Sequence, residues 1–420
     1  MGTRACLQTV ASDTSGDRLA GVLGSLYARV PLGMRLGLDA MRAVCTKADH
    51  PERRFEIVHV GGTNGKGSTC AMVESMARAA GKKTGLYTSP HLCRFAERIR
   101  INGAPLDDAS LTNVLERALD VGKDLSFFET ATLAAFMAFA EHGVDLAVME
   151  VGIGGRLDAT NVIERSRVSA ITRVAFDHMD RLGNTLEAIA VEKAGIARPG
   201  TPLVMGDMAR EPRAIIEREA RVIGAEMVGV ESRTCELQAF FARHERLPGR
   251  YQAANADVAW VVADLLGIDN FAKATGLARA RWPGRFERID APDGSYLLDG
   301  AHNPDGAAAL VASLTAAREQ VSVLVFGAMA DKAWSEMLDM LAPLARARVY
   351  VSPMGRAPAD PAAIAARHPG QTARDVRDAL ARARAIASPH GLVLVTGSLY
   401  LVGQARAKIL GLAQDPPVAL

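Results

Sequence analysis

A glycine-rich segment carries the first residues whose types and spacing could do chemistry. It reads Gly61-Gly-Thr-Asn-Gly-Lys-Gly-Ser-Thr69 and lies between an apolar strand predicted at 55–60 and a helix predicted to run to Ala80. Backbone N–H groups at the start of a helix can bind phosphate oxygens, and a lysine beside them neutralises phosphate charge. We therefore expect a nucleotide-binding loop, with a flexible glycine turn as the alternative. The expected contacts are Asn64, Gly65, Lys66, Gly67 and Ser68.

A carboxylate is predicted at the end of another apolar strand. Residues 145–151 have a strand pattern in which Glu150 follows the apolar run Leu146–Met149. Open α/β sheets bind ligands at the carboxyl ends of their strands, and a hard oxygen ligand suits Mg²⁺. We expect Glu150 to hold magnesium, while a solvated carboxylate at a strand end is the alternative.

Strands and helices alternate along the first part of the chain. A helical leader covers 14–47 with a break at 31–33. After it, the patterns predict strands at 55–60, 84–87, 145–151 and 168–172 and helices at 130–142 and 185–197. Such alternation is typical of a mostly parallel sheet with helices on both faces.

A second alternating run follows, with strands predicted at 296–299, 321–326, 348–351 and 392–395. A chain of 420 residues is long enough for two domains, and the turn-rich stretch Asp290 to Gly294 is the predicted boundary. The expected fold class is α/β, with a P-loop ATPase domain at 1–289 and a smaller Rossmann-like α/β domain at 295–420. Residues 415–420 are expected to form a loose tail.

The overall composition excludes several classes of protein. The 49 Lys and Arg nearly balance the 47 Asp and Glu, so the formal charge of +2 provides no general field for nucleic acid. The five cysteines are widely spaced without a C-x-x-C pair, which argues against disulfides and a zinc site. No apolar run could span a bilayer, and the N-terminus makes a poor secretory signal. We expect a cytoplasmic protein, with neither nucleic acid nor membrane as a partner.

The glycine-rich loop departs from the usual G-x-x-x-x-G-K-[ST] motif, because Gly67 is inserted between Lys66 and Ser68. Eight further segments of the sequence add to this motif. They are Tyr87–Leu92, Glu97–Gly103, Phe128–Thr130, Glu150–Asn161, Asp177-His178, Glu192–Ile196, Pro283–Glu287 and Leu298–Pro304. In this order, the segments resemble the folylpolyglutamate synthase and dihydrofolate synthase family of the Mur ligase superfamily, from Leu36 to Gly397. An ordered series is much more specific than one glycine loop.

The resemblance implies magnesium ligands and a modified lysine. Ser89 and Glu150 match the ligands of one ion, and His178 matches a ligand of a second. Lys193 matches a lysine that is carbamylated in the family, which requires a neutral amine and therefore burial or nearby positive charge. From the residues alone, His178 could equally be a hydrogen-bonded loop residue and Lys193 a surface ammonium. The expected catalytic residues are Lys66, Lys193 and His178.

The resemblance also implies where the substrates bind. Asn255, Arg285, Asp299 and His302 match residues that contact the nucleotide across the domain interface, although Asp299 alone could equally cap a turn. His91 is expected to be structural. The implied pterin site mixes apolar and polar groups, and core packing is the alternative for Phe128. Its expected residues are Leu36, Gly37, Leu38, Phe128, Glu129, Thr130, Gly155, Arg156, Leu157 and Asp158.

The implied activity is an ATP- and Mg²⁺-dependent ligase, expected to be a monomer, that joins L-glutamate to dihydropteroate and to folates through an acyl phosphate. A member that only extends folates is the alternative, because such members share most of these segments. A peptidoglycan-precursor ligase needs a UDP-binding domain, for which the residues before Gly61 are too few. An NTP-driven switch would leave the magnesium, lysine and second-domain segments unexplained, and the N-K-x-D motif of GTPases is missing from the sequence.

Overall fold

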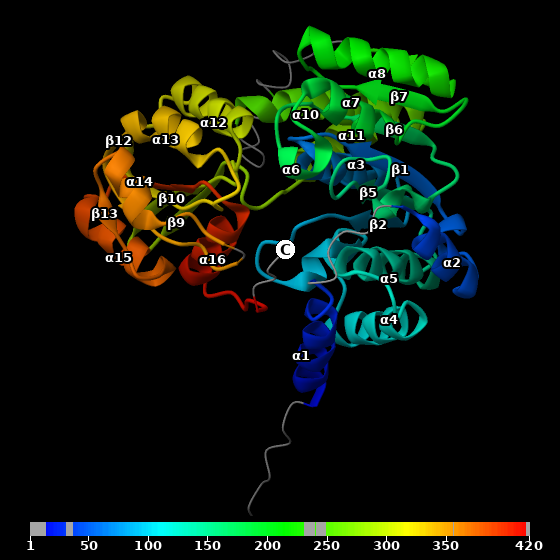
Figure 1. Ribbon diagram of the computed structural model, residues 1–420, viewed down its shortest axis with the longest axis horizontal. Coiled ribbons are helices and arrows are strands. Elements are labelled where there is room, and N and C mark those ends of the chain that lie inside the picture. The colour runs from blue at the N-terminus through cyan, green and yellow to red at the C-terminus, as the bar shows by residue number, and fades with distance from the viewer. Residues whose placement is uncertain (1–13, 31–36, 231–239, 241–248, 356, 417–420) are drawn as a thin grey trace, which may run out of the picture.

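The computed structural model describes residues 14–30, 37–230, 240, 249–355 and 357–416. These residues form two α/β domains, each built on its own sheet (Figure 1). The predicted fold class is therefore confirmed. Leu36, one of the residues expected to contact a pterin, lies outside the described residues.

The sheet of the first domain has eight strands in the order β4-β3-β2-β5-β1-β6-β7-β8. From β2 to β8 in this order the neighbours run parallel, whereas β3 is antiparallel to β2 and to β4. The carboxyl ends of β5, β1 and β6 consequently lie side by side. The strands are β1 (Glu56–Gly61), β2 (Thr84–Tyr87), β3 (Ile99–Ile101), β4 (Ala104–Pro105), β5 (Leu146–Glu150), β6 (Val168–Ile171), β7 (Pro202–Met205) and β8 (Glu226–Val228).

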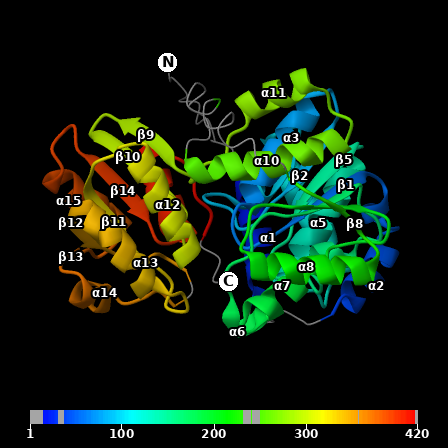
Figure 2. The same cartoon turned by 90° about the horizontal axis from the view of Figure 1, so that it is seen from above.

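Helices cover both faces of this sheet, as Figure 2 shows for α10 and α11 on one side and α7 and α8 on the other. Val58 and Val60 of β1 belong to an apolar cluster with α3, α10 and α11, whereas Ile57 packs with α1, α2, α4 and α5. A strand covered on both faces needs a continuous apolar run, which explains the sequence of β1. The helices are α1 (Thr14–Tyr27), α2 (Asp39–Lys47), α3 (Lys66–Ala79), α4 (Asp108–Val121), α5 (Phe127–Glu141), α6 (Met179–Leu182), α7 (Leu186–Ala194), α8 (Arg210–Ile223), α10 (Arg250–Leu265) and α11 (Asn270–Arg279), with short 3-10 turns η2 (Pro51–Arg53), η3 (Phe95–Arg98) and η4 (Ala159–Val162).

The second domain has a six-stranded sheet in the order β13-β12-β11-β14-β10-β9, parallel except for β9. Its strands are β9 (Glu287–Ala291), β10 (Gly294–Leu298), β11 (Val321–Phe326), β12 (Ala345–Tyr350), β13 (Gln371–Thr372) and β14 (Leu392–Thr396). Its helices are α12 (Pro304–Ala316), α13 (Trp334–Leu341), η5 (Ala342–Leu344), α14 (Pro361–Arg367), α15 (Val376–Ile386) and α16 (Leu399–Leu410).

The predicted boundary at Asp290 to Gly294 is wrong. This stretch is the turn of a hairpin in which β9 pairs antiparallel with β10, so it lies inside the second sheet. A hairpin turn has the same Gly- and Asp-rich composition as a domain linker, which explains the error. The first strand of the second domain begins at Glu287.

The predicted loose tail is wrong at Asp415. Its backbone N–H donates to Cys93 O at 2.9 Å, and its Oδ2 accepts a hydrogen bond from the Phe95 N–H at 2.7 Å. Arg94 lies 3.6 Å from Oδ1 of the same carboxylate. The described end of the chain therefore returns to the first domain. No helix in the described part of the chain combines the length and the apolar character that a membrane crossing requires.

A substitution at Gly276 of α11 tests how closely this helix packs against α3. A Cβ at this position would lie 2.4 Å from Met76 Cα in α3, whereas a Cβ at Gly24 in α1 has no neighbour within 4 Å. Gly276→Ala is expected to lower the free energy of unfolding by about 2 kcal/mol, because helix backbones must separate. The control Gly24→Ala is expected to raise it by about 0.5 kcal/mol through helix propensity. Urea denaturation measures both, and a Gly276→Ala midpoint equal to that of the wild type would contradict the close packing.

Candidate active site

The glycine-rich loop connects β1 to α3 at the carboxyl edge of the sheet. Gly62 and Gly65 have φ of +139° and +89°, a region that favours glycine. A Cβ at Gly62 would lie 2.1 Å from Thr172 Oγ1, and one at Gly65 would lie 2.2 Å from Asn255 Oδ1. Because α3 begins at Lys66, its unpaired N–H groups lie at this edge. The structure thus brings the predicted loop and Asn255 together.

Two lysine side chains meet at one backbone carbonyl. Lys66 Nζ lies 3.1 Å and Lys193 Nζ 2.9 Å from Gly62 O. Lys193 is 3% exposed, and burial together with the charge of Lys66 lowers its pKa to about 7. The interpretation of Lys193 as a surface ammonium is therefore wrong. A large fraction of this amine is neutral near pH 7, as a reaction with CO₂ requires.

Glu150 ends β5 as predicted, and its Oε2 accepts a hydrogen bond from the Ser89 N–H at 3.0 Å. Burial raises the pKa of Glu150, while the nearby Lys66 charge opposes that shift. The carboxylate and the serine hydroxyl are hard oxygen ligands of the type that Mg²⁺ prefers. Within the described residues, no three His, Cys, Asp or Glu side chains converge on a possible metal position. Phosphate oxygens and water would complete such a site, as is usual for magnesium–nucleotide complexes.

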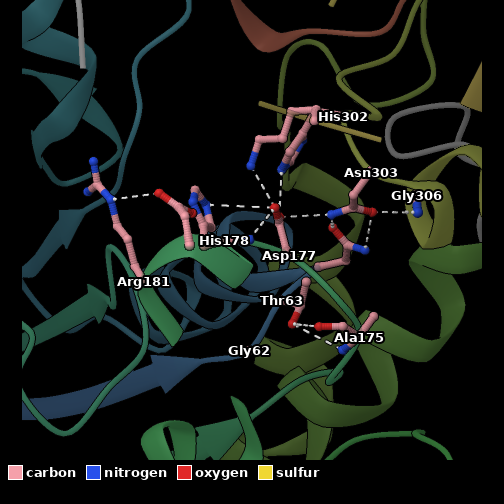
Figure 3. A network of polar contacts seen from close by, with 12 residues as sticks. Gly62, Thr63, Ala175, Asp177, His178, Arg181, His302, Asn303 and Gly306 are labelled. Carbon is pink, nitrogen blue, oxygen red and sulfur yellow. Dashed lines mark hydrogen bonds and ion pairs between the residues drawn. The ribbon is translucent and has the colours of Figure 1, made fainter. Parts of the chain in front are cut away.

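Asp177 is the centre of a polar network between the domains (Figure 3). Its carboxylate accepts hydrogen bonds from Lys332 Nζ at 2.6 Å and from Asn303 Nδ2 at 3.0 Å, and His302 Nε2 lies 3.5 Å away. Burial acts to raise the pKa of Asp177, but its partners, His302 foremost, hold the pKa well below the usual range. The ionised Asp177 of the first domain is therefore paired with groups of the second.

His178 follows Asp177 and precedes α6, with a left-handed φ of 49°. Burial lowers its pKa to about 4, although the Asp177 charge 4.0 Å away opposes the shift. The imidazole is therefore neutral at pH 7, and a neutral nitrogen can bind a metal ion.

Asn64 connects the glycine-rich loop to the second domain. Its Nδ2 donates to Asn303 Oδ1 at 3.0 Å and to Asp305 Oδ2 at 2.8 Å. Arg173 of the first domain pairs with Asp305 at 2.8 Å. Sequence reasoning did not identify Asp305, Arg173 or Lys332, and it included Asn303 only as part of the segment Leu298–Pro304. A local signal existed only for Asn303, a helix-capping residue type directly before a proline.

Asp299 lies where the domains join. It accepts hydrogen bonds from the Tyr251 hydroxyl at 2.6 Å and from the N–H groups of Phe286 and Ala301 at 2.9 Å each. Burial raises the pKa of Asp299, and the charge of Arg285 opposes this shift. The turn-capping role considered from the sequence is therefore present, and the same carboxylate also binds α10.

A pocket lies between the glycine-rich loop, the loop after β2 and the second domain. It brings together four of the predicted site residues. The other predicted residues that the structure describes do not line it, and these include Lys66, Lys193, His178 and the pterin residues as well as Asn64, Gly65, Ser68, Asn255, Asp299 and His302. His91, expected to be structural, lines it too, and its Nδ1 accepts a hydrogen bond from Arg98 Nε at 2.9 Å. The lining residues include Gly67, Ser89, His91, Glu150, Trp282, Arg285 and Leu399.

The two carboxylates predicted for a pterin site, Glu129 and Asp158, already accept hydrogen bonds from groups of the protein. Glu129 Oε2 accepts hydrogen bonds from the N–H and the hydroxyl of Ser126 at 2.8 and 2.7 Å, which closes the capping box of α5. Asp158 accepts from Ile153 N–H at 3.0 Å and from Thr160 N–H at 3.0 Å. Both carboxylates therefore hold their local backbone in place.

The other predicted pterin residues surround the loop after β5. The centroid of the half-buried Phe128 ring lies 6.1 Å from that of the Tyr87 ring. A Cβ at Gly152 would lie 2.5 Å from the Phe128 ring. Arg156 pairs with Glu192 at 2.6 Å. Gly155 packs against α7, and Leu157 follows Arg156. The Thr130 hydroxyl donates to Ser126 O at 2.8 Å. Gly37 and the buried Leu38 precede α2.

Comparison with known proteins places this geometry in a family. The Mur ligase middle domain matches residues 60–207, and the Mur ligase glutamate ligase domain matches residues 284–399. A dihydrofolate synthase/folylpolyglutamate synthase of Bacillus subtilis is 33% identical, covering 91% of this chain and 97% of that protein.

Solved structures show the same likeness. A Mycobacterium tuberculosis folylpolyglutamate synthase complexed with ADP has a TM-score of 0.82 at 29% identity, covering 94% of this chain and 99% of that one. A bifunctional folylpolyglutamate synthase/dihydrofolate synthase with Mn, AMPPNP and L-glutamate bound has a TM-score of 0.82 at 31% identity, covering 93% and 98%. The chain therefore belongs to the dihydrofolate synthase/folylpolyglutamate synthase family of Mur ligases.

Proposed function

We propose that this protein is an ATP- and Mg²⁺-dependent ligase that joins L-glutamate to dihydropteroate, forming dihydrofolate, and adds glutamate to folates. The observation that carries the proposal is the pocket that Gly67, the Ser89–Glu150 pair and Arg285 line together. Such a pocket can hold a phosphate, its counter-ion and an acyl group at once. Relatives named for both activities, and one solved with Mn, AMPPNP and L-glutamate, support it.

The reaction needs two steps, because a carboxylate is a poor acylating agent. First, a carboxylate oxygen attacks the γ-phosphorus of ATP, the bond to the ADP oxygen breaks, and an acyl phosphate forms. Then the neutral amine of glutamate attacks the acyl carbon. The C–N bond forms, the C–O bond to phosphate breaks, and the amine proton passes to solvent. No enzyme nucleophile is required, so the protein acts by positioning and by neutralising charge.

The nucleotide lies between the domains in this proposal. Residues 64–68 receive its phosphates with backbone N–H groups, and the Lys66 ammonium neutralises their charge. The further contacts of the nucleotide are Asn255 of α10, Arg285 of the segment before β9, and Asp299 and His302 of the second domain. The interdomain hydrogen bonds of Asn64 support this placement, because they join the phosphate loop directly to the second domain. Closure of the domains also keeps water from the acyl phosphate.

Ser89 and Glu150 hold one magnesium ion and His178 a second in this proposal. Bound magnesium would neutralise the charge of the transferred phosphoryl group. Lys193 contributes as a carbamate, whose negative charge attracts Lys66, whereas a protonated Lys193 beside Gly62 O would repel Lys66. The lowered pKa of Lys193 supports this modification.

In this proposal the pterin ring contacts Phe128 and the backbone of residues 155–158, and Gly37 and Leu38 complete the site. Because Glu129 and Asp158 are already hydrogen-bonded, they shape this surface more than they recognise the ligand. The substrates are small molecules, and we expect a cytoplasmic monomer.

Substrate preference tests the proposal. Purified enzyme with ATP, magnesium and glutamate is expected to convert dihydropteroate to dihydrofolate and to extend tetrahydrofolate, because one phosphate position can serve either carboxylate if the pterin shifts. Mass spectrometry identifies the products. Extension of tetrahydrofolate without conversion of dihydropteroate would leave an enzyme with folate extension alone, and ATP turnover that needs neither substrate would favour a switch.

Glu150→Gln tests the metal site. The amide keeps the shape but removes the charge, so amide synthesis is expected to fall at least about a hundredfold at ordinary magnesium and to recover partly at high magnesium. The exposed Glu164→Gln is the matched control and is expected to change neither activity nor magnesium dependence. An unchanged magnesium dependence of Glu150→Gln would exclude this residue as a ligand.

Lys193 offers a direct test of carbamylation. A protein equilibrated with ¹³C-labelled bicarbonate is expected to show a carbamate carbon signal that Lys193→Arg lacks. The signal is expected to grow as pH rises through about 7, because the fraction of neutral amine increases there. A wild-type spectrum without this signal at pH 8 would return Lys193 to the role of a buried amine.

A further inference from the structure

His91 lines the pocket beside two predicted metal ligands, but no role follows from the assigned machinery. It is two residues from Ser89 on the loop after β2, and Ser89 and Glu150 line the same pocket. Its ring is held from behind, because Nδ1 lies 2.9 Å from Arg98 Nε and the ring packs edge-on against Phe95 with centroids 5.9 Å apart.

Arg98, which holds the His91 ring, is unusual because its charged side chain is buried. The side chain is 1% exposed, and its guanidinium lies 5.5 Å from the Phe95 ring centroid and 5.1 Å from that of Phe127. Neither terminal nitrogen of Arg98 has a hydrogen-bond partner, so the hydrogen bond to His91 is the directed polar contact of this side chain among the described residues. A buried and incompletely paired charge is costly, and such groups call for a functional explanation.

The Arg98 contact fixes the tautomer of His91. An arginine Nε always carries a proton and can only donate, so Nδ1 of His91 must accept and cannot carry a proton. The ring proton therefore resides on Nε2. The two nitrogens point to nearly opposite sides of the ring, so Nε2–H points away from buried Arg98. Among the described residues, Nε2 has no hydrogen-bond partner, and the His91 side chain lines the pocket.

We propose that His91 is a catalytic residue whose Nε2–H donates a hydrogen bond to the acyl oxygen of the pteroyl substrate, with Arg98 as its positioning residue. The inference rests on the proposed function, because it names the group that receives the acyl oxygen at that site. When the glutamate amine attacks, the C=O electron pair moves to this oxygen, and the pair re-forms the carbonyl as phosphate leaves. A fixed donor stabilises the charge at that moment without reorganising.

Substitutions at His91 separate a donor from a packing role. His91→Leu is expected to lower kcat for dihydropteroate by about 10²-fold to 10³-fold, as for loss of one oxyanion donor, with KM for ATP and glutamate within about threefold. His91→Gln can place an amide N–H near the position of Nε2, so it is expected to stay within about tenfold of wild type. His390→Leu, at an exposed turn, is the matched control.

Chemical rescue keeps the test decisive if bulky substitutions disturb the loop. In His91→Ala, added 4-methylimidazole can accept from Arg98 and still donate from its other nitrogen, so kcat is expected to rise. The isomer 1-methylimidazole has the same size and can accept, but it has no N–H and is expected not to rescue. In an Arg98→Met background, which has no donor at this position, the rescue by 4-methylimidazole is expected to weaken by at least about tenfold, the cost of one charge-assisted hydrogen bond.

Several results would overturn the inference. These are a kcat of His91→Leu within about threefold of wild type, a change confined to KM for ATP or glutamate, or equal rescue by the two methylimidazoles. A wild-type enzyme that makes no glutamate-dependent amide would instead reject the proposed function, so the two failures are distinguishable.

Discussion

The pairing of the Asp177 carboxylate with the second domain is the interaction on which the assembled site depends. Taking this charge out of water is costly, and the Lys332 ammonium and the Asn303 amide offset that cost only when the domains are docked. If the domains separated, the Asp177 carboxylate and the Lys332 ammonium would lose each other and be exposed to water. The same docking places Asn303 and Asp305 against Asn64, and thereby fixes the phosphate loop. One buried carboxylate thus links domain closure to the geometry of the nucleotide site.

Desolvation acts in opposite directions on the pKa values of two groups that feel the charge of Lys66. It raises the pKa of Glu150 and lowers the pKa of Lys193, so burial disfavours the charged form of both groups. The Lys66 charge favours the ionised form of Glu150 but adds to the neutralisation of Lys193. A single ammonium therefore prepares one neighbour to be an anion and the other to be a free amine. A surface lysine could do neither, because solvent would screen its charge.

The sequence was informative where local rules decide the structure. Continuous apolar runs located β1 and β5, and the strand predicted at Val321–Phe326 agrees with β11 residue for residue. The boundary was misplaced because the turn between β9 and β10 has the composition of a linker. Asp177 came from the family resemblance, whereas its partner Lys332, 155 positions later, could not be predicted because their contact depends on domain docking. Likewise, residue spacing does not predict that the Asp158 carboxylate accepts hydrogen bonds from backbone N–H groups of its own loop.

The return of the chain end at Asp415 has a mechanical consequence. A body joined to another at one point can turn in any direction, whereas a body joined at two points turns only about the line between them. Besides the site contacts of Asp177, Asn64 and Arg173, the second domain is attached covalently through the residues before Glu287 and non-covalently through Asp415 at Cys93 and Phe95. An opening that breaks the site contacts but preserves these two attachments would turn the second domain about the line between them.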